Sequence, residues 1–177
     1  RRQQIGEGAT IDMALLDTQL AMLANQASNA MVSGNDPKSL GAGHPNIVPY
    51  QPFRAADQPI IIAVGNDSQF AKLAAILGHP AWASDPAFAT NAARVAARNR
   101  LVPMIDEIIG SQPAATWLER LEAAGIPAGP INTISQALAD PQSVHRGARI
   151  NAAGGALGEV PMVGSPIRLG GERCDAP

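Results

Sequence analysis

At 177 residues, with 13 basic and 15 acidic side chains and a formal charge of −2, the chain has no electrostatic reason to bind nucleic acid. Its apolar runs are too short to span a bilayer, and Arg1-Arg2-Gln3-Gln4 is not the start of a secretory signal. The single cysteine, Cys174, excludes an internal disulfide framework, so we expect a cytoplasmic protein with no membrane partner. Aromatic residues make up only 3%, and we expect the alanine-rich core to be completed by another domain or subunit.

The first predicted element is a long helix. Thr10 is expected to cap it, Asp12 lies in its first turn, and residues 33–37 end it. Apolar residues lie around much of its circumference: Met13, Leu15, Leu16, Leu20, Met22 and Leu23. This pattern predicts a helix that is buried on more than one side.

The central stretch, residues 40–70, combines a loop, a strand, a sharp turn and a helix. Gly41 and Gly43 open a loop that carries a His-Pro pair, and an extended segment follows at residues 49–53. A β-branched run at residues 60–64 predicts a buried strand, which breaks at Gly65. Residues 66–68 then predict the cap of a helix whose apolar face begins at Phe70. In such an arrangement the backbone can approach a ligand closely.

Further along the chain, a helical pattern runs over residues 91–109, and Pro103 predicts a kink or a break within it. Ser111 or Gln112 is expected to cap the next helix, which ends at Gly125. Two prolines make residues 126–131 an extended edge or crossing strand. The other predicted elements are a capping box at Thr133 and Gln136 that opens a short helix, and extended segments at 149–150 and 160–169.

Six short motifs, spread over nearly the whole chain, occur in a fixed order. They are Gly6-Glu7-Gly8 with Ile11-Asp12 and Leu16-Asp17; Pro49-Tyr50-Gln51-Pro52-Phe53 followed by Ala63-Val64-Gly65-Asn66-Asp67-Ser68-Gln69-Phe70; Asn91-x-x-Arg94-Val95-x-x-Arg98; Ala124-Gly125-Ile126-Pro127-Ala128-Gly129-Pro130; Asp140-Pro141-Gln142 with Arg146-Gly147; and Gly164-Ser165-Pro166-Ile167-Arg168. Together they resemble the class III CoA-transferases, a family that includes formyl-CoA and carnitine-type transferases and the related α-methylacyl-CoA racemases. The sequence departs from the family pattern at Ala9 and Gln58.

The resemblance implies a fold and a domain plan. The family has a nucleotide-binding-like α/β large domain with a smaller α+β domain inserted in it, and two subunits interlock. We therefore expect an α+β chain: a small domain with a short antiparallel sheet and helices, plus a long helix and extended segments of an incomplete large domain. The expected divisions are 1–40 for the end of the large domain's first part, 41–132 for the small domain, and 133–177 for a linker helix and the return.

The resemblance also implies a reaction. The family moves coenzyme A from an acyl-CoA to a carboxylic acid through an aspartyl-CoA thioester, with CoA as a substrate and no metal. The family's aspartate precedes the motif found here at Gly6. We therefore expect no catalytic residue in this chain, no turnover by the chain alone, and a homodimer as the working state.

The candidate substrate-binding residues are Gly41, Gly43, His44, Pro45 and Asp67. The first four match the position of the glycine loop in the formyl-CoA transferase branch, which can shield an anhydride from water; a flexible interdomain connector is the alternative. Asp67 lies near the turn where the family's racemases place a carboxylate, but it also suits an ordinary helix cap.

Several alternatives remain open from the sequence. Arg94, Arg98 and Arg100 could hold CoA phosphates, but the favoured interpretation is a solvated helix face with subunit salt bridges. His79 and His145 lack companions at metal-ligand spacing. A 2-methylacyl-CoA racemase of the same family, and a non-catalytic oligomerisation or binding module, are the competing functions.

Overall fold

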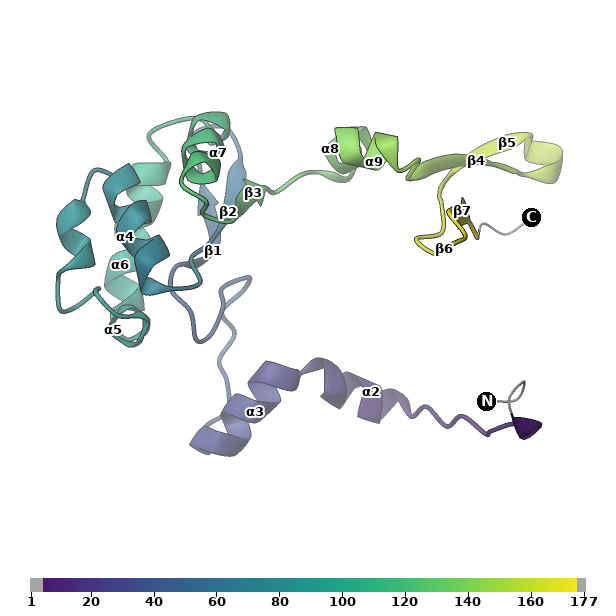
Figure 1. Cartoon of the computed structure of the whole chain (residues 1–177), viewed down its shortest axis with the longest axis horizontal. Helices are drawn as coiled ribbons and strands as arrows, with labels where there is room; N and C mark the ends of the chain where they lie inside the picture. Colours follow the sequence, from purple (N-terminus) through teal and green to yellow (C-terminus); the bar gives the residue numbers. More distant parts are fainter. Residues whose placement is uncertain (1–4, 175–177) are drawn as a thin grey trace. The chain divides into compact units, whose positions relative to one another are not determined.

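The computed structural model describes residues 5–174. This part of the chain divides into two compact units. The first comprises the residues up to Gln51 together with Ala63–Pro103, and the second comprises Pro52–Ile62 and the residues from Met104 onward. Figure 1 shows the order of the helices and strands along the chain.

The N-terminal helical region of the first unit consists of two helices, α2 at Leu15–Met22 and α3 at Ala24–Ser33. The helical conformation is interrupted between them at Leu23. Gly34 ends α3 in the left-handed conformation with φ 72°. The predicted end of the helix near residue 33 is therefore confirmed, whereas a single continuous helix is not observed.

The predicted start of this region at Thr10 is wrong. Ala14 occupies the N-cap position of α2 with extended backbone angles and no side-chain cap, so Asp12 lies before the helix and Asp17 is the acid of its first turn. Thr10 is β-branched, and no residue of α2 is buried in this chain to offset the cost of another helical turn.

The rest of the first unit contains α4 at Asp67–Ile76, a 3-10 turn at Pro80–Ala83 and α5 at Asn91–Ala96. α4 follows the predicted pattern, since Asn66 caps it and Gly78 follows its end with φ 80°. The buried apolar residues of this unit are Val48, Val64, Phe70, Leu73, Ala74, Leu77, Trp82, Phe88 and Leu101.

The helical pattern over residues 91–109 breaks at Ala97, which is the C-cap of α5, and α6 then runs over Arg98–Ile109. A break at Pro103 is not observed, because Pro103 lies inside α6, which continues to Ile109; a kink there stays a prediction. Leu101, Ile105 and Ile109 are fully buried at four-residue spacing, and this packing holds the helix through the proline, which removes only one backbone donor.

A three-stranded sheet has the order β1–β2–β3, with β1 at Tyr50–Arg54, β2 at Pro59–Ala63 and β3 at Ala128–Pro130 (Figure 1). β3 pairs antiparallel with β2, and Ile61 lies opposite Gly129. β3 is at the sheet edge, as its prolines predicted.

The core of the second unit gathers around α7, which spans Ala114–Ala123. Trp117 is buried and donates from its indole Nε1 to the carbonyl of Ile109 at 2.8 Å. The other buried apolar residues are Phe53, Ala55, Ile60, Ile62, Ile105, Ile109, Ala114, Leu121 and Ile126. Gly125 follows α7 with φ 68°, which confirms the predicted end of this helix.

The start of α7 differs from the prediction that Ser111 or Gln112 caps it. Pro113 is the N-cap residue, and the donor at Ala114 N is satisfied by Asp57 Oδ1 at 2.8 Å. Asp57 also accepts from Gln58 N at 2.9 Å. The hydrogen bond from Ala114 is the main cause that lowers the pKa of Asp57 below its ordinary value.

The C-terminal part of the second unit is a series of short elements (Figure 1). Two helices come first, α8 at Ile134–Ala139 and α9 at Pro141–His145, and the predicted capping box of Thr133 and Gln136 opens α8. β4 at Arg149–Ala153 pairs antiparallel with β5 at Glu159–Val163 across a 3-10 turn at Gly155–Leu157, and β6 at Arg168–Leu169 pairs with β7 at Glu172–Arg173. The extended segments predicted here are confirmed.

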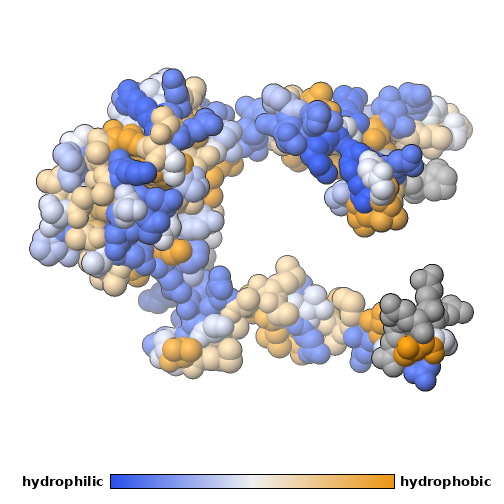
Figure 2. Space-filling model, in the orientation of Figure 1, coloured by the Kyte–Doolittle hydropathy of each residue, from blue (hydrophilic) through white to orange (hydrophobic). Residues whose placement is uncertain are grey.

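Large apolar side chains are exposed on the N-terminal segment, as Figure 2 shows over α2 and α3. Leu15 is 85% exposed and Val32 is 89% exposed. The others are Ile5, Ile11, Met13, Leu16, Leu20, Met22, Leu23 and Met31. Within residues 5–174 no residue of α2 or α3 is buried, so the burial predicted for this helix is not observed. No helix among residues 5–174 is long and apolar enough to cross a bilayer.

Candidate functional site

The loop predicted to contact substrate, residues 41–45, has a defined conformation in the first unit, together with its neighbours Leu40 and Asn46. Gly41 has φ 59°, a backbone angle that favours glycine, and Gly43 N donates to the carbonyl of Leu40 at 3.0 Å. A Cβ atom on Gly43 would lie 3.2 Å from that same carbonyl oxygen and 3.6 Å from Arg98 Nη1. The turn is therefore tight at Gly43, where a side chain would force its neighbours to shift by a few tenths of an ångström.

His44 is half-buried and is held by Tyr50 and Asn46. Its backbone N–H donates to the carbonyl of Tyr50 at 2.9 Å, and its ring stacks on the Tyr50 ring at 5.2 Å with an interplanar angle of 12°. The ring nitrogen Nδ1 accepts from Asn46 N at 3.1 Å. Because Nδ1 accepts, the neutral imidazole carries its proton on Nε2.

Arg98, the first residue of α6, binds the loop backbone directly. Its Nη2 donates to the carbonyl oxygens of His44 and Pro45, at 2.6 and 2.9 Å. Arg98 is half-buried, and desolvation lowers the pKa of its guanidinium below the ordinary value. Two adjacent carbonyls of a glycine-containing loop thus share one charged donor.

Asn46 closes the loop against two helices. The Asn91 side chain at the start of α5 donates to the carbonyl of Asn46 at 2.8 Å and accepts from Val48 N at 3.2 Å. The second helix is α3: its Asn29 side chain and the Asn46 side chain exchange amide hydrogen bonds of 3.0 and 3.4 Å. The C-terminal end of the loop, residues 44–46, is therefore fixed by side chains distant in the sequence, which disfavours a merely flexible connector.

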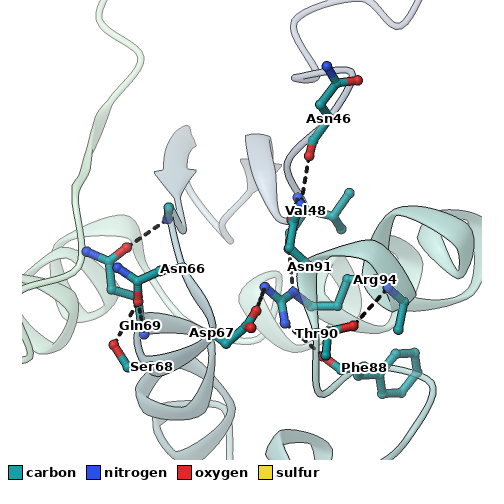
Figure 3. A network of polar contacts seen from close by, with 12 residues as sticks. Asn46, Val48, Asn66, Asp67, Ser68, Gln69, Phe88, Thr90, Asn91 and Arg94 are labelled. Atoms are coloured by element: carbon teal, nitrogen blue, oxygen red, sulfur yellow. Dashed lines mark hydrogen bonds and ion pairs between the residues drawn. The ribbon is translucent and has the colours of Figure 1, made fainter. Parts of the chain in front are cut away.

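Asp67, the remaining predicted substrate-binding residue, pairs with Arg94 in the network drawn in Figure 3. Arg94 is fully buried, and its Nη2 donates to Asp67 Oδ1 at 2.8 Å. The other guanidinium nitrogens donate to the carbonyls of Val48 at 2.7 Å and Phe88 at 2.8 Å, and the group lies 4.3 Å from the Phe70 ring centroid. Asn66, not Asp67, caps α4 by accepting from Gln69 N at 2.9 Å.

All three arginines of this region contact other groups of the same chain. Arg94 is buried and Arg98 binds the loop, so the interpretation of all three as a solvated helix face is wrong. Arg100 does lie at the surface, 4.4 Å above the Phe88 ring centroid and 3.9 Å from Asp85 Oδ2. Sequence reasoning did not anticipate that Arg94 and Arg98 bind backbone carbonyls; their place in the Asn91-x-x-Arg94-x-x-x-Arg98 motif was the only signal.

Two hollows flank the loop within the first unit. One, of about 400 Å³, is lined mainly by amide and other polar side chains with a few apolar ones: Gln26, Asn29, Val32, Ser33, Asn35, Asp36, Pro37, Lys38, Leu40, Pro45 and Asn46. The other, of about 260 Å³, is lined by Leu40, Gln51, Arg98, Asn99, Val102 and Pro103. Among residues 5–174 there is no group of three or more His, Cys, Asp or Glu side chains that could hold a metal ion.

The family model for CoA-transferase family III matches residues 1–177. The chain belongs to CoA-transferase family III. It is 45% identical over 162 residues to the succinate–glutarate CoA-transferase of Agrobacterium fabrum, a match that covers 92% of this chain and 40% of that protein. It is 34% identical over 181 residues to the acetyl-CoA:oxalate CoA-transferase of Acetobacter aceti, covering 99% of this chain and 45% of the relative.

Solved structures of the family support the same membership. A crystal structure of a CaiB/BaiF family protein from Brucella suis aligns with a TM-score of 0.74 and 44% identity, covering 97% of this chain and 44% of that one. The chain therefore spans less than half the length of the relatives it matches. The predicted α+β class, with helices and short antiparallel sheets and part of an α/β fold, is confirmed.

Proposed function

We propose that the protein to which this chain belongs is an acyl-CoA:carboxylate CoA-transferase that acts on short dicarboxylic acids. The observation that carries this proposal is the 45% identity, over 92% of the chain, to a protein named for succinate and glutarate. The acetyl-CoA:oxalate relative, at 34% identity, supports a dicarboxylate acceptor as well. The substrates are then an acyl-CoA and a dicarboxylic acid, and coenzyme A is the group transferred.

The proposed reaction proceeds through an aspartate outside the part of the family's length that this chain spans. Its carboxylate attacks the thioester, forming a mixed anhydride and releasing CoA thiolate, which then attacks the aspartyl carbonyl. That step releases the first carboxylic acid and leaves an aspartyl-CoA thioester. The acceptor carboxylate attacks this thioester, and the returning thiolate forms the new acyl-CoA and frees the aspartate. This chain alone then turns nothing over.

The role proposed for this chain is to supply the loop of Gly41, Gly43, His44 and Pro45 to the substrate. Its support is the fixed backbone of the loop and the hollows on its two sides. A fixed loop that excludes water protects an anhydride from hydrolysis. Asp67 as a substrate contact stays a prediction: its side chain is 54% exposed, and Arg94 engages one of its oxygens.

The exposed apolar residues of the N-terminal segment fit the same proposal. In the homodimer expected for the family, the remaining part of the protein covers Leu15, Leu16, Leu20 and their neighbours, which are exposed in this chain. A cytoplasmic location also remains part of this proposal.

A transfer assay tests the proposal. The full-length protein is incubated with succinyl-CoA and, in separate reactions, glutarate, oxalate, acetate or no acceptor, and the acyl-CoA products are separated by chromatography. We expect glutaryl-CoA to form in an acceptor-dependent manner, faster than acetyl-CoA. Absence of any acceptor-dependent product would refute the proposal. The 177-residue chain, assayed alongside, is expected to give none.

The racemase alternative is separated by a second reaction. A 2-methylacyl-CoA is incubated with the full-length protein in deuterated water without an acceptor. The carboxylate predicted for racemase chemistry, Asp67, is paired with a buried arginine, so we expect no deuterium at the α carbon. Exchange there would favour the racemase. A protein without either reaction would be a binding or oligomerisation module.

A further inference from the structure

Arg98 holds the loop in a way that the loop could not achieve by itself. Gly43 N and the carbonyl of Leu40 form the turn, but the carbonyls of His44 and Pro45 take their hydrogen bonds from Arg98 Nη2. Both bonds are charge-assisted, and such bonds are stronger than those between neutral groups. Arg98 therefore fixes the position of the His44 backbone.

The His44 side chain is oriented by separate contacts that depend on this backbone position. Tyr50 stacks on one face of the ring, and Asn46 N donates to Nδ1. The other ring nitrogen, Nε2, makes no hydrogen bond within residues 5–174. The half-buried His44 side chain thus presents a single N–H donor in a fixed direction.

We infer that Arg98 is a positioning residue for the transfer reaction: it holds residues 43–46 so that His44 Nε2–H donates to a carboxylate or thioester oxygen of the substrate. The inference rests on the proposed function. Such a donor stabilises negative charge on that oxygen without reorganisation only when it is held in place beforehand. Arg98 itself need not touch the substrate.

Hydrogen–deuterium exchange of the full-length protein tests the positioning without measuring activity. The variants are Arg98→Gln, Arg98→Lys and, as a matched control on the same helix, Arg100→Gln. We expect faster exchange in the peptide that covers residues 40–46 for Arg98→Gln, a smaller rise for Arg98→Lys, and no change for Arg100→Gln. Unchanged exchange in both Arg98 variants would overturn the inference.

A double-mutant cycle tests whether Arg98 acts through His44. We expect Arg98→Gln to lower kcat by roughly tenfold to a hundredfold with little change in KM for the acyl-CoA, and His44→Ala to lower it similarly. The double variant should lose little more kcat than the more damaging single variant, because both substitutions disrupt the same arrangement, His44 held in place by Arg98. Arg98→Lys should restore part of the rate, and Arg100→Gln should leave it unchanged.

The outcomes separate this inference from the proposed function. If the unchanged protein transfers no CoA, the proposed function fails, and the exchange experiment still decides whether Arg98 holds the loop. If transfer occurs but the losses from Arg98→Gln and His44→Ala multiply independently, Arg98 does not act through His44. Faster exchange with unchanged kcat also overturns the role in the reaction.

Discussion

Two regions of the chain differ sharply in burial: the surroundings of Arg94, and the N-terminal segment that contains α2 and α3. The guanidinium of Arg94 is fully buried, and it donates hydrogen bonds to two carbonyls and a carboxylate and lies over an aromatic ring. In α2 and α3 no residue is buried, although leucine and methionine side chains are abundant there. The first region is stabilised by its own contacts, whereas the second leaves its large apolar side chains exposed within residues 5–174.

The largest expected effect comes from breaking the self-contained region at its centre. Arg94→Ala removes the donor to the carbonyls of Val48 and Phe88 and leaves both buried without it. We expect a loss of about 3–5 kcal/mol in the free energy of unfolding, measured by urea denaturation of the full-length protein. Arg100→Ala serves as the control and should cost less than about 0.5 kcal/mol, since its pairing at the surface is weak. An equal cost for both variants would contradict this account of Arg94.

A second prediction tests whether the N-terminal segment is covered in the full-length protein. Leu73 is fully buried and Leu16 is 69% exposed in this chain. We nevertheless expect Leu16→Ala to cost about 2–5 kcal/mol in the full-length protein, like Leu73→Ala, because the remaining part of the protein covers Leu16 there. In the 177-residue chain alone, Leu16→Ala should have almost no effect. If Leu16→Ala is neutral in both proteins, the segment is not covered.

A third prediction concerns the tight turn in the loop. Gly43→Ala places a methyl group 3.2 Å from the carbonyl oxygen of Leu40, so the turn must shift by a few tenths of an ångström. We expect kcat for transfer to fall roughly tenfold, since small displacements of positioned groups are costly in rate, with unfolding nearly unchanged. Gly129→Ala is the control, because no atom lies within 4 Å of the added Cβ. Equal kcat values for the two variants would contradict a role for Gly43 in the substrate site.

The smallest expected effect tests the second unit. Asp57 accepts from Ala114 N and has a lowered pKa, so its carboxylate stabilises the folded state above its ordinary pKa of 3.8. This contribution disappears as the pH falls through the lower, folded-state pKa. We expect Asp57→Ala to have a lower Tm than the unchanged protein at pH 7, with the difference shrinking at acidic pH. A Tm difference that stays constant from pH 7 down to acidic pH would contradict this account of Asp57.

What the sequence predicted well is local. The β-branched run that forms β2 and the Asn66 cap of α4 each lie within a few residues, and both are confirmed. The capping box at Thr133 and Gln136 follows the same rule. Each of these features depends on contacts that close within one helical turn, so the residue types themselves carry the information.

What the sequence missed depends on long-range contacts. Asp57 satisfies the start of α7 from 57 positions away, and Arg98 binds the carbonyl of His44 across 54 positions. The residues next to Asp57 and Arg98 in the sequence do not indicate these contacts, because an acid or arginine exposed to solvent could have the same neighbours. The break at Ala97 instead of Pro103 was missed for a related reason: buried residues on α6 outweigh the local cost of the proline.

Intact-protein mass spectrometry tests the central claim, that this chain belongs to an enzyme that carries CoA as an aspartyl thioester, most directly. The full-length protein is mixed with succinyl-CoA in the absence of an acceptor, quenched in acid and weighed. The account predicts a mass increase equal to coenzyme A minus one water, which disappears when glutarate is added together with release of glutaryl-CoA. An increase equal to a stable succinyl group, or no adduct in a protein that transfers CoA, would contradict it.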